Sequence, residues 1–345
     1  MRIAIHENKN IFNHYSTWTI PWMEYCEKKN IEYKIVNCYD YDIIDQLKEF
    51  DALLWHFGNY VLQDMLFARS ILYSAKKMGL KVFPDYEDAW HFDDKIAETY
   101  ALQSVGAPIP KSWMFYTYKD LEKWAQNEID LPFVAKLRTG SGSHNVVKIK
   151  SKSQLLSYGK KMFTNGLSPV PSFGFKASSQ LKSSRNFNDF KQRLKKLPQF
   201  LHTLSRAKQF PNEKNYVYLQ EFIPNEGFDL KIVAVGDKLS YICRNIRKGE
   251  FRASGGGDLF YDKSLVTMDI IESAFETNKK LGLKCMGYDY VVDKRTNKGV
   301  IVEMSYGFSH TALLGARGYW DRKINWINEP LNTPEEIIIN LLENK

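Results

Sequence analysis

The chain has 345 residues, of which 44% are apolar and 14% aromatic, so it is too long for one small core and can bury two or three packed lobes. No run of about 18 uncharged apolar residues occurs, and the first ten residues have no apolar run after their charges, so we expect no membrane span, no signal peptide and a cytoplasmic location. The four cysteines are dispersed without metal-like spacing, and the net charge of +8 is confined to one segment, which argues against general nucleic-acid affinity.

The first 85 residues alternate between short apolar strands and helices. The patterns predict strands at residues 2–5, 31–36, 51–57 and 81–83, and helices at 22–29, 41–49 and 62–78. Strands that alternate with helices are typical of a parallel sheet, so we expect a small open-sheet α/β domain. No Gly-x-Gly-x-x-Gly motif follows the first strand, and a dinucleotide site is therefore not supported.

A helix is predicted to begin near Lys95. Asp93 or Asp94 supplies its N-cap, and Gly106 with the prolines that follow it ends the helix. Lys95 then lies in the first turn, where the helix dipole disfavours a cation. A lysine in this unfavourable place is a candidate ligand for an anion, although an ordinary surface lysine is the alternative.

A glycine-rich turn joins the next two predicted strands, residues 131–137 and 146–149. Gly140 and Gly142 allow backbone N–H groups to turn toward an anion, and Lys136 adds a positive charge at the end of the incoming strand. The Walker pattern is absent, because Gly-Lys-Ser/Thr does not occur and no helix is predicted to follow. A flexible hairpin tip is the alternative interpretation.

Residues 158–214 interrupt this order and are interpreted as an insertion. Residues 171–214 contain ten Lys and Arg residues and only two acidic residues, which accounts for the whole net charge of the chain. The part that resembles an amphipathic helix is broken at Pro198. Such a basic block is either a solvated face or a surface for an anionic partner.

Three further strands are predicted at residues 216–223, 229–235 and 239–244. The segment that follows, residues 244–258, combines Arg244, Arg247 and Arg252 with the three glycines 255–257. Arginine forks and bare amides can hold a carboxylate or a phosphate. Glycines in a mobile basic loop are the alternative.

A helix at residues 269–281, ended by Gly282, leads into a predicted hairpin of strands 285–292 and 299–304. If the hairpin is centred on Thr296, Asp289 and Glu303 stand opposite each other on one face, with Ser305 projecting from the same face. Two like charges in this position repel unless something offsets them. A divalent cation shared with substrate phosphates does so, whereas two unrelated acids on a solvent-facing hairpin are the alternative.

The order of these features resembles the ATP-grasp superfamily, closest to the branch that includes the RimK-type ligases. The resemblance covers roughly residues 82–310 and rests on six features in the family's order. It implies an α/β protein in which an open-sheet pre-ATP-grasp domain (1–110) precedes a two-lobed ATP-grasp α+β domain. The small lobe is expected at 111–215, with the basic insertion at about 158–214, and the large lobe with a C-terminal helix at 216–345.

The resemblance also implies a nucleotide site for ATP. Lys95 and Lys136 look like the two lysines that contact the nucleotide phosphates. The loop expected to close over those phosphates comprises Gly140, Ser141, Gly142 and Ser143. The hinge expected to read the adenine edge comprises Gln220, Glu221, Phe222 and Ile223.

Further positions match the family's ribose, metal and transfer sites. Asp229 matches the acid that holds the ribose hydroxyls, and Arg252 falls where the family has a cation near the transferred phosphate. Asp289 and Glu303 match magnesium ligands. The family's third ligand is usually Asn, but this chain has Ser305, and the family's Asp-x-Arg is Asp229-x-Lys231. Serine still offers an oxygen, whereas lysine keeps the charge of arginine without its bidentate fork.

The implied reaction joins a small-molecule carboxylate to an amine. The carboxylate attacks the γ-phosphate of ATP, and magnesium and lysines must neutralise the charge that moves. The acyl phosphate then reacts with the amine to give amide, ADP and phosphate. Candidate donors to the oxyanion of the tetrahedral intermediate are Arg247, Arg252 and the amides of residues 255–257, with Gly256 at their centre. Closure of the glycine turn is expected to exclude water.

The acid and the amine are not identified by the sequence. The basic insertion suggests a phosphate-bearing acceptor, such as a nucleotide-linked uronic acid in bacterial surface-polysaccharide synthesis, and a homo-oligomer is compatible with the sequence. Three alternatives are an ATP-grasp kinase that phosphorylates a hydroxyl, a non-catalytic ATP-binding module, and nucleic-acid binding through the insertion. The last is disfavoured, because no recognised RNA or DNA module is present.

Overall fold

The computed structural model describes residues 1–9, 16–59, 61–140, 145–169, 210–246 and 258–343. The described chain divides into two compact units. Unit 1 comprises residues 1–58, 63–111 and 223–345, and unit 2 comprises 59–62 and 112–222. Unit 2 therefore starts beside the predicted start of the small lobe, while unit 1 joins the predicted N-terminal domain to most of the predicted large lobe.

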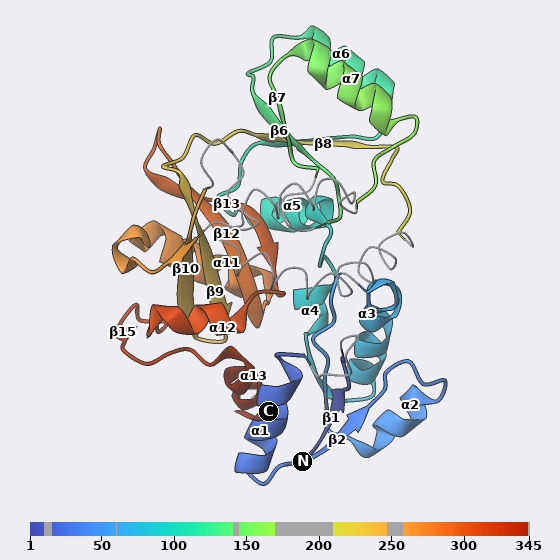
Figure 1. Ribbon diagram of the computed structural model, residues 1–345, viewed down its shortest axis with the longest axis vertical. Helices are drawn as coiled ribbons and strands as arrows, with labels where there is room; N and C mark the ends of the chain where they lie inside the picture. Colours follow the sequence, from blue (N-terminus) through green and yellow to red (C-terminus); the bar gives the residue numbers. More distant parts are fainter. Residues whose placement is uncertain (10–15, 60, 141–144, 170–209, 247–257, 344–345) are drawn as a thin grey trace, which may run out of the picture. The chain divides into compact units, whose positions relative to one another are not determined.

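The N-terminal part of unit 1 is the parallel α/β sheet that the sequence predicts. Its strands have the order β2-β1-β3-β4, and every neighbouring pair is parallel. The strands are β1 (Arg2–His6), β2 (Glu32–Val36), β3 (Ala52–Leu54) and β4 (Lys81–Phe83). The helices are α1 (Thr19–Lys28), α2 (Ile43–Gln46) with the 3-10 turn η1 (Leu47–Glu49), and α3 (Leu62–Lys77), drawn in blue in Figure 1.

Two helices lead from this sheet toward the rest of unit 1. They are α4 (Tyr86–Ala89) and α5 (Lys95–Ser104). The Asp94 side chain accepts the backbone N–H of Ala97 at 3.1 Å, which satisfies a donor that the first helical turn leaves unpaired. The predicted start of this helix at Lys95 and its cap are therefore confirmed.

The second sheet of unit 1 is antiparallel throughout and has the strand order β13-β12-β9-β10-β14-β15, with β11 added to β10. Its long strands are β9 (Phe228–Val235), β10 (Lys238–Asn245), β12 (Cys285–Asp293) and β13 (Lys298–Ser305). The short ones are β11 (Leu259–Phe260), β14 (Tyr319–Trp320) and β15 (Trp326–Ile327). The accompanying helices are η2 (Lys263–Leu265), α11 (Met268–Leu281), α12 (His310–Leu313), η3 (Leu314–Ala316) and α13 (Thr333–Glu343).

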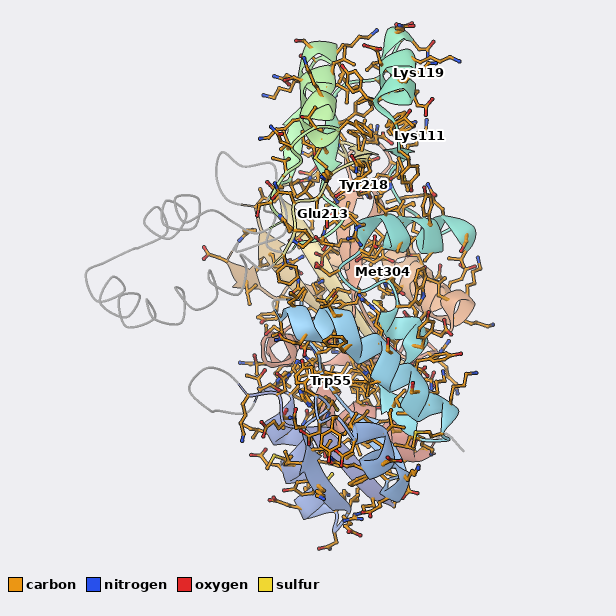
Figure 2. All side chains as sticks on the ribbon, turned by 90° about the vertical axis from the view of Figure 1, so that its right-hand side faces the viewer. Trp55, Lys111, Lys119, Glu213, Tyr218 and Met304 are labelled. Atoms are coloured by element: carbon orange, nitrogen blue, oxygen red, sulfur yellow. The ribbon has the colours of Figure 1, made fainter. Side chains whose placement is uncertain are left out.

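One core joins the two sheets of unit 1, which explains why residues 1–110 do not separate from the C-terminal part. Buried aromatic side chains from both sheets belong to a single cluster, among them Trp55 of the N-terminal part and Tyr306 after β13. The Tyr306 hydroxyl donates to the Phe57 carbonyl at 2.6 Å, and the Trp22 indole donates to the Pro334 carbonyl at 3.1 Å. Trp55 and Met304, both labelled in Figure 2, are fully buried in this unit.

Unit 2 is built on an antiparallel sheet with the order β5-β8-β6-β7. Its strands are β5 (Ser112–Phe115), β6 (Phe133–Lys136), β7 (Val147–Ile149) and β8 (Val217–Glu221), and its helices are α6 (Tyr118–Gln126) and α7 (Lys152–Met162). Trp124 of α6 packs on Trp113 and Phe133, so α6 covers one face of the sheet. Helix α7 includes residues 158–162, the first residues of the predicted insertion, whose bounds stay a prediction.

No helix among the described residues is long and apolar enough to cross a membrane.

Candidate active site

The two predicted metal ligands are direct cross-strand neighbours. Asp289 of β12 pairs with Glu303 of β13, as predicted. The hairpin is not centred on Thr296, however, because near its turn Asp293 pairs with Lys298 and Tyr290 pairs with Ile301. The register shifts at a β-bulge between Asp289 and Tyr290, so that Glu303 rather than Val302 lies opposite Asp289. The bulge therefore creates the pairing of the two acids.

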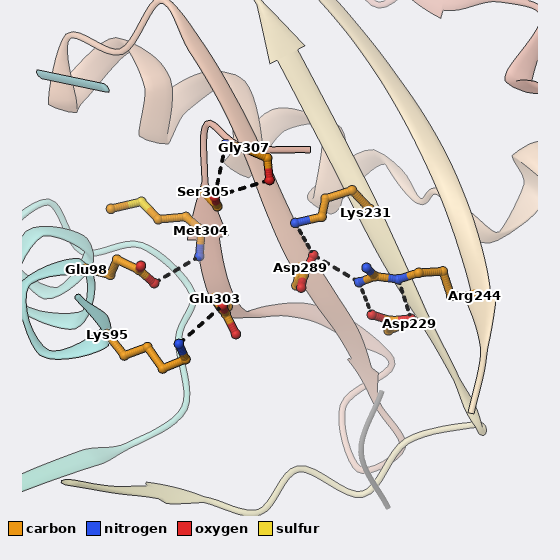
Figure 3. A network of polar contacts seen from close by, with 10 residues as sticks. All are labelled: Lys95, Glu98, Asp229, Lys231, Arg244, Asp289, Glu303, Met304, Ser305 and Gly307. Atoms are coloured by element: carbon orange, nitrogen blue, oxygen red, sulfur yellow. Dashed lines mark hydrogen bonds and ion pairs between the residues drawn. The ribbon is translucent and has the colours of Figure 1, made fainter. Parts of the chain in front are cut away.

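Cations of the neighbouring strands offset the charge of Asp289. Lys231 of β9 is its other cross-strand neighbour, and the two form an ion pair of 2.6 Å. A guanidinium nitrogen of Arg244, from β10, lies 3.0 Å from the same carboxylate (Figure 3). Burial alone would raise the pKa of Asp289, but Arg244 and Lys231 together outweigh it and hold this pKa below its usual value. Asp289 is therefore ionised although it is buried.

Asp229 shares Arg244 with Asp289. Its carboxylate is fully buried and accepts from the Arg244 guanidinium through both oxygens, one of them at 3.0 Å from Nε. Burial raises the pKa of Asp229 to about 7, although Arg244 opposes the rise. Both oxygens of Asp229 are thus engaged by Arg244. The contact holds the guanidinium in place, and the expected contact of Asp229 with a ribose stays a prediction.

Helix α5 brings a lysine and an acid to the other side of the carboxylate pair. The Lys95 ammonium, which is buried, lies 3.6 Å from Glu303. Glu98, one turn further along the helix, is also buried, and its carboxyl accepts the backbone N–H of Met304 at 3.4 Å. Burial and the charge of Glu303 raise the pKa of Glu98 well above its usual value, against the opposing effect of Lys95. Burial thus favours the protonated form of Glu98, while Glu303 pairs with Lys95.

Ser305 lies on the same sheet face as Glu303, as expected, two residues along β13. Its hydroxyl accepts the backbone N–H of Gly307 at 3.0 Å and lies 3.3 Å from the Gly307 carbonyl. This contact stabilises the turn after the strand. A role of Ser305 as a metal ligand stays a prediction.

In unit 2, two of the predicted nucleotide residues share one sheet face. Lys136 pairs with Tyr218 and Gln220 pairs with Val134, so that the side chains of Lys136 and Gln220 project from the same side of the sheet. The side chains of Trp113 and Phe133 project from the other side of the sheet, where they contact α6. Both side chains are buried. Glu221 follows on the opposite face, and Phe222 lies just beyond the strand.

Lys148 of β7 joins this face and was missed by the sequence analysis. It pairs with Val134, and its ammonium lies 3.3 Å from the centre of the Phe222 ring. Burial lowers the pKa of Lys148, with a further contribution from Lys150. A signal was present in the sequence, since Lys148 and Lys150 alternate with apolar residues in the second strand of the glycine hairpin. The face therefore carries two lysines, Lys136 and Lys148, beside Gln220.

The start of the glycine-rich turn is fixed by an acid from the far end of the insertion. Glu213 accepts from the Arg138 guanidinium at 3.2 Å and from the Thr139 hydroxyl at 2.8 Å. Gly140 adopts a φ of +102°, and a Cβ there would come within 3.0 Å of the Pro169 carbonyl oxygen, so glycine is required.

Several predicted site residues lie outside the described part of the chain, namely Ser141, Gly142, Ser143, Arg247, Arg252 and Gly256.

The sequence analysis also missed Glu98 and the contacts of Arg244. The helical spacing of Lys95 and Glu98 places both on one side of α5, but only the packing of that helix on β13 shows what they contact. Ile223 belongs to unit 1 and is buried. Thus Lys95, Asp229, Asp289, Glu303 and Ser305 come together in unit 1.

The donor set of this sheet face suits magnesium bound together with ATP. Among the described residues, no group of three His, Cys, Asp or Glu side chains is placed to hold a metal. Magnesium, however, is commonly held by one or two carboxylates and completes its coordination with substrate phosphates and water. Asp289 and Glu303 supply two such carboxylates on one face, and Lys95, Lys231 and Arg244 complement the negative charge of a triphosphate.

No protein-family model and no curated protein sequence matches this chain. Solved structures match it along nearly its whole length. A RimK-domain ATP-grasp protein of Sphaerobacter thermophilus has a TM-score of 0.54 and 15% identity, with 99% of this chain and 100% of that protein covered. The D-alanine–D-alanine ligase of Bacillus anthracis, complexed with ATP, has a TM-score of 0.54 and 12% identity, with coverage of 99% and 97%.

A third match is the biotin carboxylase domain of the Hydrogenobacter thermophilus 2-oxoglutarate carboxylase, in complex with MgADP, ADP and bicarbonate. Its TM-score is 0.59 at 11% identity, with 99% of this chain and 70% of that chain covered. The three structures share their fold with this chain, the first of them is named as an ATP-grasp protein, and the fold predicted from the sequence is confirmed.

Proposed function

Because this chain has the ATP-grasp fold, we propose that it is an ATP-dependent ligase that activates a carboxylate as an acyl phosphate and joins it to an amine. The observation that carries the proposal is the pairing of Asp289 with Glu303 on a sheet face that three cations border. A site of this composition suits a bound polyanion, because it offers two acids for a metal and three cations for phosphate oxygens.

The proposed roles divide between the two units. In unit 1, Asp289 and Glu303 hold magnesium, with Ser305 as the third oxygen. The bound metal neutralises phosphate charge during transfer. In unit 2, Lys136 and Lys148 contact phosphate oxygens, and Gln220 with Glu221 and Phe222 reads the adenine edge.

The reaction proceeds in two transfers. A carboxylate oxygen of the substrate attacks the γ-phosphorus of ATP, the bond from that phosphorus to the β-γ bridging oxygen breaks, and ADP leaves. The amine nitrogen then attacks the acyl carbon, phosphate leaves with the electrons of the C–O bond, and the nitrogen loses a proton. Lys95 and Lys231 neutralise charge in the first transfer, while Arg247, Arg252 and the Gly256 amide donate to the oxyanion in the second.

The test is product analysis with a panel of acids and amines. Purified protein is incubated with ATP and magnesium, and ADP release is measured with acid alone, amine alone and both. We expect ADP only when an acid is present, a hydroxamate when hydroxylamine replaces the amine, and amide when both substrates are supplied. ADP formation with a hydroxyl acceptor and no acid would identify a kinase instead, and ATP binding without turnover under any substrate would identify a non-catalytic module.

Glu303→Gln provides the matched site variant. It keeps the size of the side chain and removes the charge that pairs with Lys95, so we expect turnover to fall by at least about 100-fold, the typical cost of removing one group that stabilises transition-state charge. Asp293→Asn is the control, because Asp293 lies on the same hairpin but pairs with Arg295, whose side chain is half exposed. Equal turnover in the two variants would contradict the proposed role of Glu303.

The acceptor is proposed to carry phosphate, as in a nucleotide-linked uronic acid of surface-polysaccharide synthesis. The support is the charge of residues 171–214, most of which lie outside the described part. Changing Lys191, Arg193, Lys195 and Lys196 to Gln is expected to raise KM for such an acceptor and leave KM for ATP unchanged. The control changes four exposed lysines of α6 and α7 (Lys119, Lys123, Lys160 and Lys161). An unchanged KM for the acceptor in the first variant rejects this substrate.

A further inference from the structure

Asp229 lies on the sheet face of the two acids but out of reach of a bound molecule. Its exposed fraction is 0%, so a ligand on this face has no access to either carboxyl oxygen. Its cross-strand partner Arg244 binds both oxygens: Nε donates to Oδ1 at 3.0 Å, and the terminal nitrogen Nη2 donates to Oδ2. In this arrangement Asp229 acts on the site through the guanidinium that it holds.

The same guanidinium joins Asp229 to Asp289. The Nη2 atom of Arg244 that contacts Asp229 also lies 3.0 Å from Oδ1 of Asp289 (Figure 3). The ammonium of Lys231 lies 2.6 Å from the same Oδ1. Two cations therefore converge on one oxygen of Asp289, which is itself buried. No described residue forms a hydrogen bond or an ion pair with Oδ2, so Oδ2 is the oxygen left for a metal.

The orientation of the Asp289 carboxyl group depends on these partners, because the terminal torsion of an aspartate has broad minima of its own. Lys231 is a point charge on a flexible stem and constrains direction weakly. Arg244 is a planar fork, and a fork bound through two nitrogens to one carboxylate has a fixed direction. The contact with Asp229 thus gives Arg244 the rigidity that orients Asp289.

We infer that Asp229 is a positioning residue, which holds Arg244 through both carboxyl oxygens and thereby keeps Oδ2 of Asp289 available to the metal. Groups that contact a metal ligand fix its orientation, and their removal typically lowers metal affinity by about 10–100-fold. The inference rests on the proposed function, in which Asp289 binds magnesium. It gives Asp229 a role different from the ribose contact that the family resemblance implies, and the two roles can be separated by experiment.

The first measurement is the affinity of the full chain for Mn²⁺, whose free ion is observed by EPR. It is made with and without one equivalent of ADP, against a protein-free control for Mn²⁺ held by ADP alone. Asp229→Asn keeps the size of the side chain and loses one of the two oxygens that accept from Arg244. We expect the Mn²⁺ dissociation constant of this variant to rise by about 10-fold or more.

Arg244→Gln separates positioning from a simple effect of charge. If charge alone mattered, loss of the acid would weaken Mn²⁺ binding and loss of the cation would strengthen it. Positioning predicts weaker binding in both variants. Because Asp229 acts through Arg244, the double variant should bind Mn²⁺ no more weakly than either single variant, although its net charge equals that of wild type.

The ribose role is tested by calorimetry in EDTA with ADP and its 2′-deoxy and 3′-deoxy analogues. If Asp229 held the ribose hydroxyls, wild type would prefer ADP to an analogue and Asp229→Asn would lose that preference. If Asp229 positions Arg244, the ratio of the ADP and analogue dissociation constants is the same in wild type and variant.

Asp293→Asn is the matched control for Mn²⁺ binding. Asp293 is also buried and also contacts a guanidinium, that of Arg295, through both oxygens. It lies four residues along β12 from Asp289, which corresponds to about 13 Å. This variant should therefore bind Mn²⁺ as wild type does.

The inference is overturned if Asp229→Asn keeps the Mn²⁺ affinity of wild type, if Arg244→Gln binds Mn²⁺ more tightly, or if Asp293→Asn loses as much affinity as Asp229→Asn. Loss of the preference for ADP in Asp229→Asn also overturns it, in favour of the ribose contact. Wild-type protein that binds ADP but no Mn²⁺ would instead reject the proposed metal site, and the inference with it. Thermal unfolding identifies a variant that does not fold, and the sign of the change in the other variant then decides.

Discussion

Two buried carboxyls of unit 1, Asp289 and Asp88, have pKa values that are shifted in opposite directions. Their exposed fractions are similar, 4% for Asp289 and 0% for Asp88. Asp289 contacts two cations, Lys231 and Arg244, which hold its pKa below the usual value. Among the described residues, only backbone N–H groups donate hydrogen bonds to Asp88, and burial raises its pKa to about 7. The comparison teaches that the partners of a buried acid, more than its depth, decide whether it is charged.

The largest expected effect comes from removing the charge of Asp289. Asp289→Asn leaves Lys231 and Arg244 buried with one acid fewer, and breaking a buried pair in this way costs about 3–5 kcal/mol. We expect the free energy of unfolding in urea to fall by this amount and ATP turnover to be lost.

Asp293→Asn is the matched control for this substitution, because Asp293 is also buried but its partner Arg295 is half exposed to solvent, which screens the pair. If both variants lost the same stability, the two buried cations around Asp289 would contribute no more than one half-exposed cation.

The contributions of the two carboxyls to the free energy of unfolding should change with pH in opposite directions. Asp88 has a raised folded pKa, so its contribution is fully present below its unfolded pKa of 3.8 and is lost as pH rises toward about 7. The loss amounts to up to about 4 kcal/mol, from about 1.4 kcal/mol per pKa unit. Asp289 has a lowered pKa, and its contribution is lost as pH falls below 3.8.

Urea unfolding of wild-type protein and Asp88→Asn between pH 4 and 8 measures this difference. Asn does not titrate, so the stability of the variant relative to wild type should increase with pH across this window. Parallel pH profiles for the two proteins would show that Asp88 is ionised in the folded state and would remove the contrast with Asp289.

Replacing the forked guanidinium of Arg244 by an ammonium group is expected to have a smaller effect on the free energy of unfolding. Arg244→Lys keeps the charge but cannot contact Asp229 through two nitrogens while one of them also contacts Asp289. We expect a loss of about 1–3 kcal/mol in urea unfolding, the cost of a charge-assisted hydrogen bond. The same change at Arg322, whose pair with Asp237 is exposed, should be close to neutral. A neutral Arg244→Lys would mean that charge alone holds the acids.

The smallest effect near acidic pH is expected for Glu98→Gln. Glu98 lies between the two extremes, since it is buried near one cation, Lys95, and one anion, Glu303, and its pKa is raised. Gln resembles the protonated acid and can still accept from the Met304 N–H, so the variant should match wild type at pH 4. Because the unfolded acid loses its proton above about pH 4.5 and the folded one only at a higher pH, the variant should gain relative stability as pH rises. A constant difference between pH 4 and 8 would argue against a protonated Glu98.

Most of the local structure follows from the sequence because it depends on patterns that neighbouring residues set. Alternating strands and helices predicted the parallel sheet, Asp94 predicted the start of α5, and Gly282, with its φ of +68°, ends α11 as expected. Elements β5, α6 and α7 were not predicted. In β5, Trp113 and Phe115 pack on Trp124 of α6, and Trp113 also packs on Phe133, so that the burial of this strand depends on residues outside it.

The sequence alone determined that Asp289 and Glu303 belong to one hairpin, that Lys95 begins a helix and that Lys136 ends a strand, since each depends on a few consecutive residues. The tertiary structure decided the rest. A bulge between Asp289 and Tyr290 sets Asp289 opposite Glu303, packing of α5 on β13 brings Lys95 and Glu98 to them, and the meeting of α4 with β12 buries Asp88. These contacts join residues far apart in the chain, and the charge of each acid depends on the partners it meets there.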